Sequence, residues 1–144
     1  MKKLKKYLLP AICFLLILLW VYAASSKLME FGMFRAQMSK QALFPFLKNS
    51  MPYLLPPAEF LTAGLLLFET TLRTGFYLSF VMLLAFTIYI GLGISGVFGK
   101  VPCSCGGILS HMSWNVHFVF NIFFLLLTVF GIYIVHGERR GKDQ

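Results

Sequence analysis

The chain has 144 residues, of which 58% are hydrophobic and 12% are charged. Soluble domains contain roughly 45–50% apolar and about 25% charged residues. This composition therefore excludes an ordinary water-soluble domain and predicts that the chain is embedded in the lipid bilayer. The formal net charge of +8 lies at segment ends and in loops. Because these basic residues do not form a patch with interleaved aromatic residues, the charge does not predict a nucleic-acid partner.

The first predicted element is a membrane-spanning helix over residues 7–26. Its apolar stretch is longer than the core of a usual signal peptide, so a retained helix is favoured over a cleaved one, although Ala23 and Ala24 resemble a cleavage site. Residues 27–50 mix charges with aromatic and Met side chains. This mixture is typical of a helix lying at the membrane interface, and we expect Pro45 to end that helix.

Three further stretches have the length and apolar character of a bilayer crossing, which takes about 20 residues. They are residues 53–72, 75–98 and 114–135. The predicted fold class is therefore an all-α membrane protein, a four-transmembrane-helix bundle with an interfacial segment between helices 1 and 2. Residues 1–144 are expected to form a single membrane domain.

The distribution of basic residues indicates how the bundle is oriented. With the N-terminus inside, eight Lys and Arg residues lie on the inner side and five on the outer side, with the strongest excess at the two termini. Cytoplasmic segments carry such an excess, so we expect a multi-pass protein of the bacterial inner (plasma) membrane with both termini in the cytoplasm. The loop between the third and fourth spans then faces the periplasm.

That loop contains two cysteines one residue apart, Cys103 and Cys105, in the segment PCSCGG. An oxidising compartment permits a disulfide between them, and so small a ring is strained, which favours exchange. Because the bridge closes almost no loop, it would stabilise the fold little. A redox pair is the favoured interpretation. A structural disulfide or quiet thiols remain alternatives, as does a Cys2His2 metal set with His111 and His117, although we predict no metal.

Three polar residues in the predicted spans form the second candidate site. His117 and Asn121 are four residues apart and share a helix face. At 1.5 Å per residue Glu59 lies about 9 Å deep and Asn121 about 10 Å deep. A Glu at this depth is costly unless paired or neutral, so we predict a polar intramembrane site of Glu59, Asn121 and His117 beneath the cysteines, with Thr62 from the next turn.

This polar site has more than one interpretation. As a catalytic group, His117 would tune a thiolate or accept its proton, and the cluster would relay protons or orient a quinone headgroup. Alternatively, His117 is an interfacial residue bonded to water or a carbonyl, and Glu59 is a protonated group that supports helix packing. A quinone is the one cofactor that we consider, and the sequence does not specify it further.

Three stretches of the chain resemble the MauE/DoxX-like redox-associated membrane proteins. They are ASSKL at 24–28, LPPAEF at 55–60, and PCSCGG at 102–107 followed by SW at 113–114. The resemblance implies a DoxX-like four-helix bundle. It also implies that Cys103, Cys105 and Glu59 help to make or maintain disulfides in a periplasmic dehydrogenase subunit, or carry reducing equivalents. Nothing in the sequence indicates an amine substrate.

We therefore predict an inner-membrane thiol–disulfide redox protein that exchanges electrons with a periplasmic partner, thioredoxin-like or disulfide-containing, through Cys103 and Cys105. Because Cys13 stands alone, a relay across the bilayer would need a second carrier, such as a quinone or a partner protein. The alternative is a non-catalytic membrane subunit that anchors or stabilises a larger envelope complex, with residues 27–50 as its docking surface. Solute or metal transport is a weaker option, and no motif supports a hydrolase or a kinase.

Overall fold

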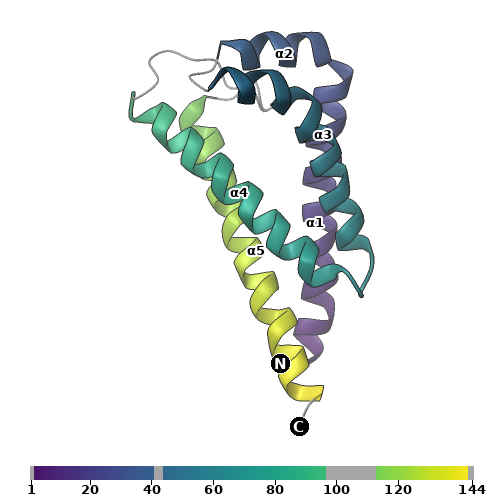
Figure 1. Ribbon diagram of the computed structural model, residues 1–144. Helices are drawn as coiled ribbons and strands as arrows, with labels where there is room; N and C mark the ends of the chain where they lie inside the picture. The colour runs from purple at the N-terminus through teal and green to yellow at the C-terminus, as the bar shows by residue number, and fades with distance from the viewer. Residues whose placement is uncertain (1, 41–43, 97–112, 143–144) are drawn as a thin grey trace.

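The computed structural model describes residues 2–40, 44–96 and 113–142. These residues form five α-helices (Figure 1). The helices are α1 (Lys2–Met29), α2 (Phe31–Ser39), α3 (Pro45–Leu67), α4 (Leu72–Ile94) and α5 (Trp114–Lys142). The described part of the chain is thus entirely helical, as the sequence predicted. Three helices, α1, α4 and α5, are long and apolar enough to cross a membrane.

The segment between the first two predicted spans is divided differently from the prediction. The short helix α2 ends at Ser39, and α3 begins at Pro45. The expectation that Pro45 ends a helix is therefore wrong. Proline suits the first position of a helix, because its fixed φ is already helical and its missing N–H would have no intrahelical partner there. Helix α3 consequently starts eight residues before the predicted Tyr53.

Helix α3 differs in composition from the three apolar helices. It contains three internal prolines, Pro52, Pro56 and Pro57, and the carboxylate of Glu59. These residues lower its hydropathy, and α3 is not among the helices that length and composition alone identify as spans. In Figure 1 the first part of α3 lies beside α2 across one end of the molecule, and the rest of the helix runs alongside α1 and stops short of the two chain ends.

The helices form two neighbouring pairs, α1 with α3 and α4 with α5, while α2 lies across one end (Figure 1). The start of α1 and the end of α5 lie together at the other end. The Lys5 ammonium there is 5.7 Å from the centre of the Tyr133 ring. Both ends of the described chain therefore lie on the same side of the bundle, far from α2.

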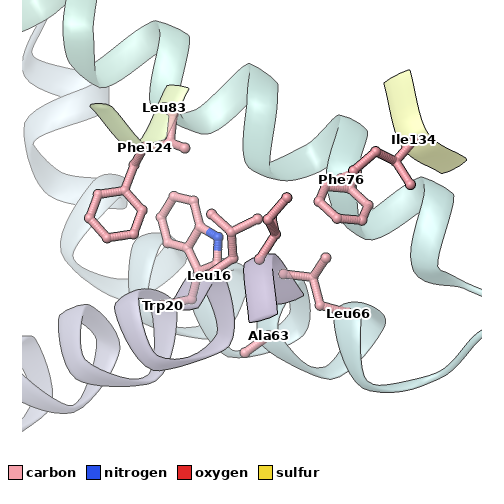
Figure 2. Packing of buried hydrophobic residues seen from close by; sticks show 9 residues of the cluster. Leu16, Trp20, Ala63, Leu66, Phe76, Leu83, Phe124 and Ile134 are labelled. Atoms are coloured by element: carbon pink, nitrogen blue, oxygen red, sulfur yellow. The ribbon is translucent and has the colours of Figure 1, made fainter. Parts of the chain in front are cut away.

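The core between the two pairs is apolar and closely packed (Figure 2). It is formed by Ile12, Leu16, Trp20, Ala63, Leu66, Phe76, Leu83, Phe124 and Ile134. Phe76 of α4 lies directly on the backbone of α5 at Gly131, where any Cβ would overlap its ring. The Trp20 indole Nε1 donates a hydrogen bond to Ser79 Oγ at 2.9 Å. This bond ties α1 to α4 and holds the indole in one orientation.

Candidate functional site: a buried ion pair beside a cavity

A buried ion pair joins α1 to α3 at the end of the molecule near α2. Lys27 lies in the last turn of α1, and its Nζ is 2.8 Å from Glu59 Oε1. The two side chains are only 4% and 1% exposed. The sequence predicted that Glu59 must be paired or neutral, and the structure supplies a cationic partner. That partner was not predicted, because Lys27 was assigned to the interfacial segment.

Further contacts surround the Lys27 ammonium. It donates to the carbonyl oxygen of Ala23 at 3.4 Å, and it lies 5.7 Å from the centre of the Phe34 ring. Phe34 is a buried residue of α2, so this short helix packs against the ammonium of the ion pair. Removing two charges from water costs several kcal/mol per ion, and a buried pair is weak evidence for stability. Buried ionisable groups in membrane helices usually mark functional sites.

A cavity of about 270 Å³ lies beside the pair, lined by residues of all five helices. Five aromatic residues line it: Trp20, Phe86, Tyr89, Trp114 and Phe120. Its charged and hydrogen-bonding residues include Lys27, Glu59, His117 and Asn121. Glu59, His117 and Asn121, which the sequence analysis grouped by depth, therefore line one cavity together with Lys27. Their catalytic and relay roles remain predictions.

Two polar atoms at this cavity lack partners among the residues that the structure describes. They are the second carboxylate oxygen of Glu59, Oε2, and the amide nitrogen of Asn121, Nδ2. Buried polar groups are nearly always hydrogen-bonded, and leaving one unpaired costs about 1–3 kcal/mol. One atom is an acceptor and the other a donor. Both residues line the cavity, so these two atoms are the groups with which a bound molecule would pair.

The walls of the cavity are held by specific packing. The ring of Trp114 lies against Gly93 of α4, where a Cβ would stand 2.5 Å from a ring carbon. The absence of a side chain at Gly93 therefore lets the start of α5 approach α4 closely. His117 is 2% exposed, and its ring meets Phe120 nearly edge-on. These contacts fix the start of α5, which carries both His117 and Asn121.

Thr62 does not belong to the group. It is fully buried, but its hydroxyl donates to the Ala58 carbonyl at 2.8 Å and lies 3.4 Å from Met82 Sδ. It is not among the residues that line the cavity. A threonine within a helix commonly satisfies its hydroxyl on the carbonyl four residues earlier, which is why its depth did not predict its role.

The predicted cysteine site lies outside the described residues. Cys103, Cys105 and His111 all fall in the segment 97–112, so their redox, structural and metal interpretations stay predictions. Cys13 is a free thiol packed against the apolar core. Within the described ranges, no group of three or more His, Cys, Asp or Glu residues could hold a metal ion.

The fold and the cavity define a multi-pass helical membrane protein with a buried ion pair at one end of its bundle. The sequence model described as "Methylamine utilisation protein MauE" matches residues 5–134, and the chain belongs to this family. The match confirms the resemblance, and its range contains the ion pair, His117 and Asn121. Comparison with curated proteins and with solved structures found no match.

Proposed function

We propose that this MauE-family protein is an inner-membrane thiol–disulfide redox protein. Cys103 and Cys105 exchange electrons with a periplasmic protein that is thioredoxin-like or carries a disulfide. In one direction, the two thiols of one protein become a disulfide while the disulfide of the other becomes two thiols. Two electrons and two protons move in each exchange, and the reverse reaction follows the same stoichiometry.

The observation that carries this proposal is the buried Lys27–Glu59 pair at the cavity. Two charges are held away from water, 2.8 Å apart, beside an unpaired acceptor and an unpaired donor. Such an arrangement is costly for stability, and ionisable groups buried in membrane helices usually mark a functional site. The cavity is also lined by the first residue of α5, Trp114. In the chain, the cysteine segment directly precedes this helix, which supports a functional link between the two.

Membrane topology forms part of the proposal. The start of α1 and the end of α5 lie at the same end of the bundle (Figure 1), which requires an even number of crossings. We infer that α3 crosses the bilayer together with α1, α4 and α5, giving four spans with α2 at the interface. Since the first part of α3 lies beside α2 (Figure 1), only the remainder of this helix would lie in the hydrocarbon core.

Single introduced cysteines test this topology. In a background without native cysteines, Ser39→Cys at the end of α2 and Thr70→Cys between α3 and α4 both replace exposed residues. A membrane-impermeant maleimide is expected to label position 39 in spheroplasts, and position 70 only after lysis. Labelling of both positions in intact spheroplasts would show that α3 does not cross the membrane.

The redox proposal is tested by the state of the cysteine pair in cells. Cells carrying Cys13→Ala are quenched in acid and labelled with a thiol-reactive mass tag before and after reduction. We expect a mixed population of dithiol and disulfide that shifts with respiratory state, and no shift in the double variant Cys103→Ser/Cys105→Ser. Thiols that stay fully reduced, or a disulfide that never turns over, would contradict the proposal.

The same experiment separates the alternative, a non-catalytic subunit that anchors a larger envelope complex. In that case the cysteine double variant leaves the redox state of other proteins unchanged, whereas charge reversal at Arg35 or Lys40 disrupts assembly. Arg35 is exposed on α2, and its guanidinium lies 6.0 Å from the centre of the Tyr53 ring. A charge reversal there would therefore alter the outer surface of α2 while the buried Phe34 and Met38 remain in place.

A further inference from the structure

The cavity combines three properties that together describe a ligand. Its wall is largely apolar and includes five aromatic side chains, the two unpaired polar atoms of its lining residues are complementary, and the charges of the adjacent pair cancel. A neutral molecule with a flat ring and oxygen substituents matches all three. We propose that this cavity binds the headgroup of a single-ring quinol or quinone taken from the membrane.

The size of the cavity fits one substituted ring. An apolar cavity of about 150 Å³ is enough to bind benzene, and this one measures about 270 Å³. The additional volume accommodates ring substituents and the first part of an isoprenoid tail. The wall is also preformed, since Trp20 is held by Ser79 and Trp114 is packed on Gly93. A preformed site loses less conformational entropy when its ligand binds.

The hydrogen-bonding groups exclude a purely apolar occupant. A lipid acyl chain would fill the space but would leave Glu59 Oε2 and Asn121 Nδ2 without partners. A quinol hydroxyl donates to a carboxylate oxygen, and a quinol or quinone oxygen accepts from an amide N–H. The ionised Glu59 therefore pairs only with the reduced form, whereas Asn121 pairs with both. It follows that the site binds the quinol more tightly than the quinone.

Isothermal titration of the full-length protein in nanodiscs tests this inference. The probes are tetramethylhydroquinone under argon and its oxidised form, tetramethylbenzoquinone, with empty nanodiscs subtracted. Because a hydrogen bond to a charged group is worth about 1.5–3 kcal/mol, the hydroquinone should bind at least about tenfold more tightly. Equal affinity for the two forms, or no binding above that of empty nanodiscs, would overturn the proposal.

Variants separate the two hydrogen bonds. Asn121→Leu should weaken both probes by a similar factor of about tenfold, because it removes the donor. The paired change Lys27→Met/Glu59→Leu removes the acceptor without stranding a charge, and should bring the two affinities within about twofold of each other. Thr128→Val is the matched control, since this buried α5 hydroxyl donates to the Phe124 carbonyl and does not line the cavity. Equal weakening by Thr128→Val would contradict the assignment.

The position of the bound probe is read from fluorescence. Both tryptophans of the chain, Trp20 and Trp114, line the cavity. The quinone should quench emission in each of the single-tryptophan variants Trp20→Phe and Trp114→Phe. Binding without quenching in either variant would place the probe elsewhere and overturn the proposal.

The inference does not depend on thiol exchange. All titrations are repeated in the double variant Cys103→Ser/Cys105→Ser, where the proposal requires unchanged affinity. Quinol binding in this variant together with an inert cysteine pair in cells would refute the redox proposal alone. A reacting cysteine pair without quinol binding would refute the cavity assignment alone.

Discussion

Replacing Lys27 by methionine should strongly destabilise the protein. Methionine has a similar length, so the main change is the loss of the ammonium that lies 2.8 Å from Glu59 Oε1. The carboxylate of Glu59 is 1% exposed, and its second oxygen already lacks a partner within the described residues. Breaking a buried pair in this way costs about 3–5 kcal/mol, because one charge is left uncompensated.

The double variant Lys27→Met/Glu59→Leu tests whether this cost comes from the stranded charge. Replacing a whole buried pair by apolar residues is often neutral or stabilising. We therefore expect the double variant to lie within about 1 kcal/mol of the parent protein or above it. Lys40→Met, at an exposed position on the end of α2, is the control and should change stability by less than about 0.5 kcal/mol.

The assay is equilibrium unfolding in mixed micelles of increasing SDS fraction, followed by helical circular dichroism and by tryptophan emission. A double-mutant cycle then gives the coupling energy between the two side chains. If Lys27→Met costs less than about 1 kcal/mol, or the double variant loses as much as the two single variants together, the pair is not the buried, mutually dependent unit described above.

Two further substitutions test the packing that supports the site. Gly131→Ala should destabilise the bundle by about 1–3 kcal/mol, because its Cβ would overlap the ring of Phe76. Gly64→Ala is the control: it has open space around it and should be neutral or stabilising by up to about 1 kcal/mol. Equal effects of the two substitutions in the same SDS titration would refute this packing. Ser79→Ala removes the hydroxyl that accepts the hydrogen bond of the Trp20 indole. It should lower the free energy of unfolding by about 1–3 kcal/mol and shift the tryptophan emission. Unchanged emission would show that the hydrogen bond does not orient the indole ring.

The sequence predicted the helical class and the shared depth of the polar residues. Helices have a constant rise per residue, so counting from the ends of two predicted spans placed Glu59 and Asn121 near one level. The cavity that both residues line agrees with that count. The unpaired atoms at the cavity could not be predicted, because they depend on side-chain directions that residue counting does not give.

The role of Lys27 was missed for a different reason. Hydropathy treats a lysine after an apolar run as the end of a span in the headgroup region, so the first helix was ended at Ser26. In the structure α1 continues to Met29, and Phe34 of α2 covers the ammonium. The stretch ASSKL contained the signal, since the resemblance already placed Lys27 and Glu59 in two of its three motifs. Pro45 was misread because proline favours the start of a helix as much as it opposes continuation.

The ion pair also has a consequence for biogenesis. Helix α1 leaves the ribosome first, and its lysine meets the carboxylate only 32 residues later, once α3 has been made. Until then the ammonium has no counter-ion in the apolar phase, and it must reach toward the headgroups, as lysines near helix ends do. Docking of α3 would then draw this charge inward, so α1 and α3 are expected to leave the translocon as a hairpin rather than one at a time. Integration of the first helix would thus be completed by the third.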